Sequence, residues 1–239
     1  YNATFQGNQA HEGSVYYLTA SLGATIVSTV GANTKFSSNG DSGIRVSFSR
    51  SNGSLSFEEN SYIQETKSFL SVSMFDQSRY EILLSDMTAV NCSNCIDTES
   101  MDFSAVALTI LNSRFLGINK YAISLTSVTT LVSEELVQVK VRNSSFVGTP
   151  GANAIQGTAS NRASISMEVS DSNFTSFSSD ADGGAVQFIA VAQSYTNLTF
   201  SKCLFQNVKA LGGTNGGAVA STCFRSTCAA TVDLSHFID

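Results

Sequence analysis

The sequence has little proline, histidine, tryptophan or charge. It contains one proline, Pro150, two histidines and no tryptophan among 239 residues. A proline-rich stalk is therefore excluded, and two histidines leave little material for a Ser-His-Asp constellation. Charged residues make up 13% of the chain, about half of the usual share, and the formal net charge is −6. This charge excludes the ordinary, strongly basic kind of nucleic-acid binder.

Long apolar runs and helical patterns are also missing. No apolar run approaches the roughly 20 residues that a membrane-spanning helix needs. No segment repeats its apolar residues with the 3.6-residue period of a helix between suitable caps. Yet 42% of the chain is hydrophobic, which is enough for a core and argues against disorder. We therefore expect an all-β chain and treat residues 1–239 as a single domain.

Short alternating segments that end in Phe are the most regular feature. Residues 137–146 read VQVKVRNSSF and residues 165–174 read ISMEVSDSNF. Alternation of apolar and polar residues predicts a strand with one buried face. A bend rich in Gly, Asn and Ser follows each segment, and a second strand pattern comes after it, as at 183–188 (GGAVQF). One repeat is thus expected to contain two strands joined by a bend.

The residue that ends each segment, here called the anchor, recurs at nearly even intervals along the chain. Eight steps lead from residue 5 to residue 237, and only the step from residue 36 to residue 57 is irregular, being clearly shorter than the others. The anchors are expected to stack inside the fold: Phe5, Phe36, Phe57, Met87, Phe115, Phe146, Phe174, Phe205 and Phe237.

Strand-only repeats in the range of roughly 20 to 50 residues predict a solenoid or a propeller. A propeller blade needs roughly 40 residues and four strands, and these repeats are too short for one. We expect a right-handed parallel β-helix of about eight coils. At about 4.8 Å per coil, the stack would be roughly 40 Å long. An antiparallel β-sandwich uses the same alternation and remains the alternative.

Two short motifs give a resemblance to a known repeat. Phe-x-x-Asn occurs at 5–8, 36–39 and 57–60, and Gly-Gly-Ala-Val occurs at 183–186 and 216–219. The chain resembles the polymorphic outer-membrane-protein type of repeat, which combines both motifs in a right-handed parallel β-helix. No single repeat here carries both motifs in full, so the chain looks like a divergent member. The resemblance implies display at the cell surface or secretion, and adhesion rather than a shared reaction.

The chain has five cysteines, an odd number. Cys92 and Cys95 lie in a bend of the repeat, where a disulfide is favoured over a redox motif that would open a helix. Two of Cys203, Cys223 and Cys228 are expected to pair, and a bond from Cys223 to Cys228 would close a short loop. A zinc site that used both close pairs would have to bridge about four coils, so we expect no metal and no cofactor.

Six N-x-S/T sequons are candidate N-glycosylation sites. Most of them fall on the stretch that leads from the first strand of a repeat into its anchor. Glycans there would line one side of the rod and would supply solubility that the few charges do not. The candidates are Asn2, Asn52, Asn91, Asn143, Asn173 and Asn197.

These features predict an extracellular or cell-surface protein with a structural or adhesive role. Neither end of the pattern shows the polar cap that a solenoid needs in water. We therefore expect open coil ends that associate head-to-tail into a filament. N-linked glycans and a surface polysaccharide or receptor are the other expected partners, and neither nucleic acid nor a membrane span is expected.

Two alternative functions remain open. A carbohydrate-binding or carbohydrate-cleaving β-helix would carry two or more carboxylates in a groove on one exposed face. A pilin-like β-sandwich subunit would show antiparallel pairing and a donated terminal strand. We expect no enzyme and no catalytic residues, since the charges near the first strand of the repeats alternate in sign and face outward: Glu81, Lys140, Glu168 and Lys202.

Overall fold

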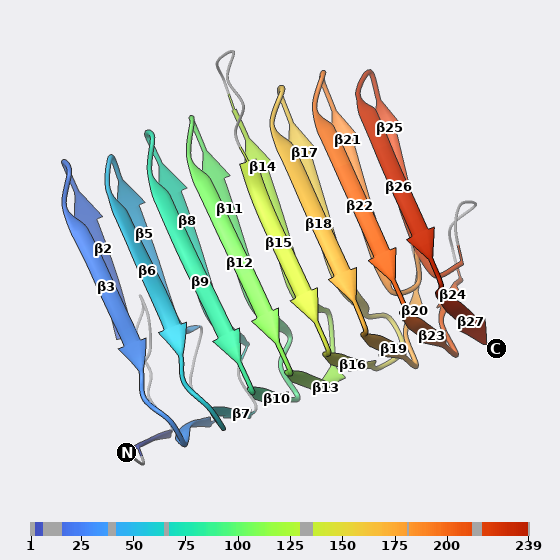
Figure 1. Cartoon of the computed structure of the whole chain (residues 1–239), viewed down its shortest axis with the longest axis horizontal. Helices are drawn as coiled ribbons and strands as arrows, with labels where there is room; N and C mark the ends of the chain where they lie inside the picture. The colour runs from blue at the N-terminus through green and yellow to red at the C-terminus, as the bar shows by residue number, and fades with distance from the viewer. Residues whose placement is uncertain are drawn as a thin grey trace.

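The strands of this chain stack as a parallel solenoid (Figure 1). The computed structural model describes residues 3–6, 16–37, 42–64, 67–129, 136–180, 182–211 and 217–238. Every regular element in these residues is a strand, and the strands pair in parallel, so the parallel β-helix is confirmed and the antiparallel β-sandwich is wrong. None of the elements described is a helix that could cross a membrane.

Three long sheets run along the solenoid, each with one strand per coil. Sheet A contains β1 (Ala3–Gln6), β4 (Thr34–Ser37), β7 (Tyr62–Gln64), β10 (Thr88–Val90), β13 (Arg114–Ile118), β16 (Ser145–Gly148), β19 (Asn173–Thr175), β23 (Leu204–Gln206) and β27 (His236–Ile238). Sheet B contains β2 (Tyr16–Ser21), β5 (Ser42–Ser49), β8 (Ser68–Phe75), β11 (Asn94–Met101), β14 (Tyr121–Val128), β17 (Asn153–Ser160), β21 (Val186–Val191) and β25 (Val219–Phe224). Sheet C contains β3 (Thr25–Val30), β6 (Asn52–Phe57), β9 (Arg79–Ser85), β12 (Ala105–Leu111), β15 (Leu136–Arg142), β18 (Ser164–Ser170), β22 (Tyr195–Ser201) and β26 (Thr227–Asp233). Two short strands, β20 (Ser178–Ser179) and β24 (Lys209–Ala210), pair beside them.

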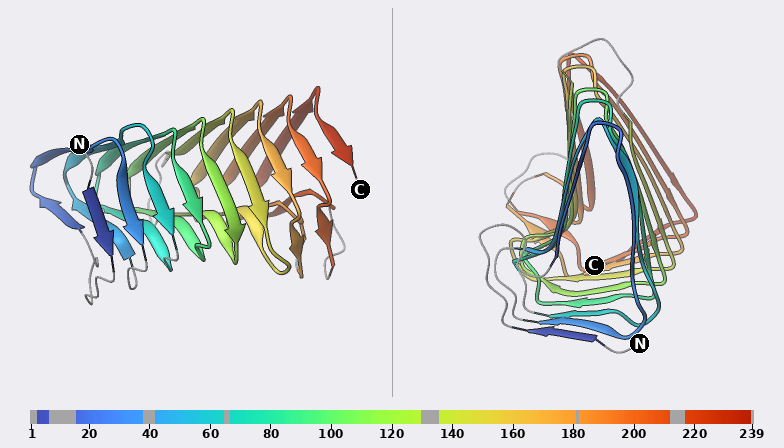
Figure 2. Two further views of the ribbon diagram at one scale, coloured as in Figure 1. Left: turned by 90° about the horizontal axis from the view of Figure 1, so that it is seen from below. Right: turned by 90° about the vertical axis from the view of Figure 1, so that its left-hand side faces the viewer.

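The three sheets enclose a triangular cross-section. Viewed from its N-terminal end, the chain passes along sheet A, up sheet B and back down sheet C, and it turns clockwise as it recedes (Figure 2). The solenoid is therefore right-handed, which is the hand that connections between parallel strands prefer.

One residue per coil with left-handed backbone forms the corner between sheets C and A. Its φ lies between 47° and 59° in every coil, and where another coil follows, its N–H bonds to a carbonyl of that coil, as Asn112 does to Arg142 at 3.0 Å. Asn and Asp tolerate this conformation better than most residues, which accounts for their frequency here. From first coil to last, the corner residues are Asn33, Asn60, Asp86, Asn112, Asn143, Asp171, Lys202 and Leu234.

A column of phenylalanine rings fills the core beside sheet A. Parallel strands in register bring the same inward-facing position of each coil to the same height. Consecutive rings stack face to face at 4.9 to 5.0 Å, with interplanar angles of 2° to 7°. The predicted anchors in this stack are confirmed: Phe115, Phe146, Phe174, Phe205 and Phe237. Phe5 and Phe36 are in register with each other in the first coils.

The structure corrects two of the nine anchors. The column passes through Ile63 and Ala89, which connect Phe36 to Phe115 in register. The three coils between Phe36 and Phe115 are therefore shorter in sequence than the coils before and after them. Because three short coils follow one another, their column positions differ from those that a regular spacing predicts.

The two anchors predicted in their place, Phe57 and Met87, are buried but lie elsewhere. Phe57 points inward from β6 of sheet C, and its ring packs edge-on against Phe69 at 5.1 Å. Met87 precedes β10 by one residue, and its N–H bonds to Ser113 Oγ at 3.2 Å. Alternation identifies an inward-facing residue without saying which sheet carries it, and this ambiguity explains the error at Phe57. Met87 lies two residues before Ala89, the column position of the same sheet, so its error is a shift along the chain.

The predicted disulfides Cys92–Cys95 and Cys223–Cys228 are both present. The first closes the bend between β10 and β11, and the second bridges the corner between β25 and β26 of the last coil. Disulfides persist in oxidising compartments, so the two bonds indicate an extracellular type of environment. Cysteines held in disulfides also do not serve as the zinc-ligand pairs considered above.

The Gly-Gly-Ala-Val segment at 183–186 stacks on its counterpart in the next coil. Gly184 and Ala185 donate backbone hydrogen bonds to the carbonyls of Gly217 and Ala218, at 2.8 and 2.9 Å. A Cβ at Gly184 would lie 2.6 Å from the carbonyl oxygen of Lys209, so this position requires glycine. The close approach of two coils therefore explains the motif on which the resemblance rests.

Candidate functional site

The last coil leaves the core of the solenoid open. Phe237 is 56% exposed, whereas Phe205, one coil earlier in the same column, is 1% exposed. Val232 is 46% exposed, and its neighbour Phe200 in β22 is fully buried. The strands β25, β26 and β27 are the last in their sheets, so one edge of each has no neighbouring strand among the described residues.

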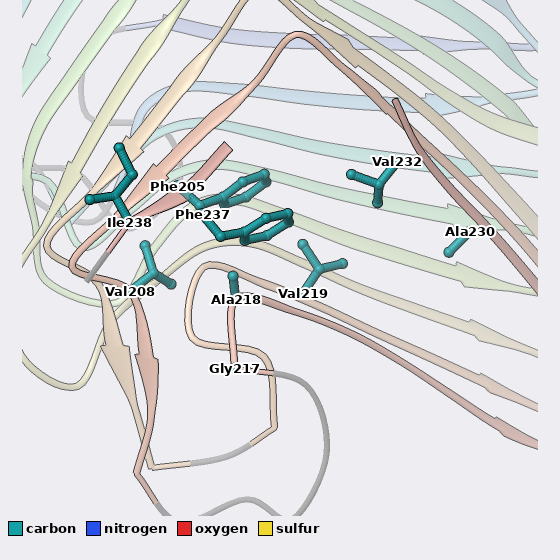
Figure 3. A pocket seen from close by; sticks show the side chains of 9 residues that line it. All are labelled: Phe205, Val208, Gly217, Ala218, Val219, Ala230, Val232, Phe237 and Ile238. Atoms are coloured by element: carbon teal, nitrogen blue, oxygen red, sulfur yellow. The ribbon is translucent and has the colours of Figure 1, made fainter. Parts of the chain in front are cut away.

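Residues of this coil and of the coil before it line an apolar cavity of about 520 Å³ (Figure 3). The parallel rings of Phe205 and Phe237 lie in its middle, with Val232 on one side and Val208 on the other (Figure 3). Contiguous apolar surface on a soluble protein marks an interaction site. The geometry therefore favours a contact that covers this end.

The first coil is covered less completely than the middle coils in the described residues, although Leu18 and Ala20 of β2 are buried. Ile26 and Val30 of β3 pack against the core but are only partly buried, and Tyr16 of β2 is exposed. Edge strands are usually protected by charged residues or proline. The strands β1, β2 and β3 contain neither, and β25 to β27 contain only Asp233 and His236. Among the described residues, the end strands of the three sheets therefore carry few of the groups that usually protect a strand edge.

A polar groove of about 500 Å³ follows the corner between sheets C and A on the side of the solenoid. We call it the asparagine corner groove. The left-handed corner residues form one wall, and the first residues of the following strands of sheet A form the other. Asn143 Nδ2 donates a hydrogen bond of 2.9 Å to Asn112 Oδ1 across two coils. The groove is lined by Asp86, Asn112, Ser113, Arg114, Asn143, Ser144, Ser145, Asp171 and Asn173.

The structure places five of the six candidate glycosylation sites. Asn143 and Asn173 both line the asparagine corner groove. Asn197 is half-buried within β22, and Asn2 lies outside the described residues. The exposed sequons are Asn52, Asn91, Asn143 and Asn173.

The charged residues that the sequence singled out do not gather at one place. Glu81 lies 4.0 Å from Arg79 on β9 and is exposed. Lys140 and Glu168 are in register on β15 and β18, and Lys202 is a corner residue. Exposed pairs of this kind contribute little free energy, and they form no cluster that could carry acid–base chemistry.

Asp97 and Glu99 form a pair that the sequence analysis missed. They lie two residues apart on β11, both half-buried on the outer face of sheet B. Alternate residues of a strand share a face, so their Cα atoms are about 6.6 Å apart. Ser71 and Ser124 flank Asp97 in register, which places the carboxylates among hydroxyl groups. The signal is an acid-x-acid pattern within a predicted strand.

Cys203 is free and buried, and it replaces a serine in a column that lines the same corner. In neighbouring coils, Ser172 donates its hydroxyl to the carbonyl of Ser170 at 2.7 Å, and Cys203 Sγ lies 3.4 Å from the equivalent carbonyl of Ser201. Burial raises the pKa of the Cys203 thiol, because the thiolate would lose its hydration. The odd cysteine is thus a packing residue in this structure.

We expect Cys203 in the folded chain to react with iodoacetamide at pH 8 on the order of 100-fold more slowly than in 6 M guanidinium, because the thiol reacts only when the coil opens. Mass spectrometry of the non-reduced protein measures this rate, since the other four cysteines are in disulfides. Equal rates in the two conditions would show that Cys203 is accessible.

Comparison of the chain with protein-family models, with curated proteins and with solved structures gave no match. The functional argument therefore rests on the geometry of the chain itself.

Proposed function

We propose that the chain is a structural or adhesive module of an extracellular glycoprotein, built into a surface fibre through its open coil ends. The observation that carries this proposal is the exposed core of the last coil. Phe237 and Val232 occupy positions that are fully buried in the coil before them, yet about half of each side chain is exposed. Covering such side chains contributes about 25 cal/mol for every Å² of apolar surface removed from water.

A second copy of the chain fits this end in the way that a further coil would. Among the described residues, its β1, β2 and β3 are the end strands of sheets A, B and C, and they would pair with β27, β25 and β26. The register of the columns would place Val30 of the second copy over Val232. Each joint would pair three parallel strands and close the apolar cavity.

A contact between two different ends leaves both outer ends free, so it does not close into a dimer. Head-to-tail contacts of this type produce filaments when the rotation between subunits does not close a ring. At about 4.8 Å per coil, each subunit would add roughly 40 Å to the length of the filament.

An extracellular location and the glycoprotein character rest on separate observations. Two disulfides are compatible with an oxidising compartment. Four sequons are exposed, where N-linked glycans have room. The repeat resembles the polymorphic outer-membrane-protein type, whose members are displayed at surfaces, and we propose that the chain is a divergent relative that contacts a receptor or a surface polysaccharide.

Sedimentation velocity over a range of concentrations tests the proposed joint. We expect the unchanged chain to form longer species as its concentration rises, and Phe237→Asp to stay monomeric, because a carboxylate in the joint would lose its hydration. Leu83→Asp is the matched control, since Leu83 is 41% exposed on the lateral face of sheet C. It should assemble like the unchanged chain.

Two outcomes would contradict the proposal. A chain that remains monomeric at every concentration does not assemble through its ends. Assembly of Phe237→Asp with the same concentration dependence as the unchanged chain would place the contact on another surface.

A further inference from the structure

Hydrogen bonds between and within coils hold the backbone of the asparagine corner groove in place. The corner residues Asp86, Asn112, Asn143 and Asp171 each donate a backbone hydrogen bond of 3.0 to 3.1 Å to the next coil. The buried serines between its two walls, Ser113 and Ser144 among them, use their hydroxyls to bond backbone carbonyls at 2.8 and 2.9 Å. The polar side chains of the walls therefore project from a fixed backbone, which lowers the entropy lost when a ligand binds.

The groove offers hydrogen-bond donors and acceptors side by side. The bond from Asn143 Nδ2 to Asn112 Oδ1 orients both amides, and each retains a further polar group, Asn112 Nδ2 and Asn143 Oδ1. Arg114 and Asn173 add donors from the opposite wall, and Asp86 and Asp171 add acceptors at the two ends. A ligand whose groups both donate and accept hydrogen bonds fits this surface, and sugar hydroxyls are such groups.

The spacing and the charge of the groove narrow the ligand class further. One corner residue recurs per coil, about every 4.8 Å along the solenoid axis, which is close to the length of one pyranose unit in a linear chain. Two carboxylates and the guanidinium of Arg114 line the groove, and the guanidinium of Arg142 lies 4.0 Å from Asp171. These charges balance, so the groove has no excess of positive charge that would favour a polyanion such as a nucleic acid or an acidic polysaccharide. A neutral saccharide remains.

We infer that the asparagine corner groove is a binding site for a neutral saccharide chain that lies along the solenoid axis. The site binds without cleaving. Asp86 and Asp171 are three coils apart, about 14 Å, whereas the paired carboxyls of glycosidases lie about 5 to 9.5 Å apart. The same distance prevents the two carboxylates from sharing a metal ion.

The saccharide has two possible sources, which share one chemistry. It is either a separate polysaccharide or the N-linked glycan of the chain itself, since Asn143 and Asn173 are sequons within the groove. The groove lies on the lateral face, so the inference is independent of the end-to-end contact and is testable on monomeric Phe237→Asp.

The first arm of the test uses the full chain with Phe237→Asp, made without glycosylation in a bacterial periplasm. Titration with chitotetraose or mannotetraose, followed by ¹H–¹⁵N NMR, should shift the side-chain amides of Asn112, Asn143 and Asn173. Asn112→Asp removes a donor and keeps a residue that tolerates left-handed backbone. It should weaken binding about three- to tenfold, as expected for one hydrogen bond. Asn173→Asp, on the opposite wall, is the second groove variant.

Asn52→Asp is the matched control, because Asn52 is exposed at the start of β6, outside the groove. Its affinity should equal that of the parent. The inference is overturned if neither saccharide shifts a groove amide at about 10 mM, a limit that already corresponds to very weak binding. It is equally overturned if neither groove variant weakens binding more than Asn52→Asp does, with the spectra showing that all variants are folded.

The second arm uses the chain secreted from a eukaryotic host. If the chain's own glycan fills the groove, mass spectrometry finds Asn143 or Asn173 occupied, and the saccharides bind only after an endoglycosidase has trimmed the glycan. If the ligand is a separate polysaccharide, the secreted and the unglycosylated proteins bind alike. Occupied sequons with unshifted groove amides in both proteins would support glycosylation while contradicting a saccharide site.

Discussion

Phe146→Ala should lower the free energy of unfolding by about 3 to 5 kcal/mol, the range measured for large aromatic side chains removed from cores. Phe146 is fully buried, and its ring stacks between those of Phe115 and Phe174 at 4.9 and 5.0 Å. The neighbouring rings are held by parallel strands in register, so they move little into the space that the missing ring leaves. Urea denaturation followed by circular dichroism measures the change.

Phe237→Ala is the matched control, because it removes the same ring from the same column at the open end. The ring of Phe237 stacks on that of Phe205 at 4.9 Å, and Phe237 is more than half exposed. We expect a loss of at most about 1 kcal/mol at a concentration where the chain is monomeric. Similar losses for the two variants would mean that Phe237 is as well covered as Phe146, which contradicts an open last coil.

Gly157→Val should be the most disruptive single addition to the core. Gly157 lies in β17, between Leu125 and Phe188 in register, and the ring of Phe188 occupies the space where a Cβ would stand. Since Phe188 is fully buried, its ring has little room to turn away. Overpacking of this kind costs about 1 to 3 kcal/mol, and we expect the upper end or more, because the clash involves a ring enclosed by packed neighbours.

A double-mutant cycle separates this clash from a general preference for glycine. Phe188→Ala should restore part of the stability lost in Gly157→Val, because the new side chain then occupies the space that the ring leaves, so the two losses are not additive. Gly217→Val is the control, since a Cβ at that position meets no heavy atom within 4 Å in the part of the chain that the structure describes. It should change stability by less than about 0.5 kcal/mol. Additive losses at 157 and 188 would refute the contact.

The sequence predicted the second half of the column because three signals agree there. From Phe115 to Phe237 the coils have nearly equal lengths, each has an alternating strand before the anchor, and the anchor is always Phe. In the short coils the column narrows to Ile63 and Ala89, and Phe57 and Phe69 fill the core from the other two sheets. Large side chains from the other two sheets therefore accompany the small residues of the column in these coils.

A different alignment of the sequence would have located these positions. The left-handed corner residue always stands three residues before the column position, as Asn60 does for Ile63 and Asp86 does for Ala89. Few L residues adopt positive φ without strain, and six of the eight corner residues are Asn or Asp. Asn or Asp three residues before an apolar residue therefore locates the two short coils, at Ile63 and Ala89, that Phe alone misses.

The candidate sites were less predictable than the fold, because each depends on what neighbouring coils place together. The short separation of Cys223 and Cys228 was enough to predict their bond. To predict the groove, the corner residues of four coils must be aligned with one another. The wrongly placed anchors Phe57 and Met87 prevented that alignment. To predict the open end, one must know that no coil follows Phe237 among the described residues. In the repeat pattern, Phe237 is simply the last copy of the anchor.

Negative-stain electron microscopy of the secreted chain, over a range of concentrations, tests most directly whether a second copy covers the open coil end. We predict filaments with an axial repeat of roughly 40 Å, since each subunit contributes about eight coils. Phe237→Asp should give short single rods under the same conditions. Dispersed rods of the unchanged chain at every concentration would contradict assembly through the coil ends.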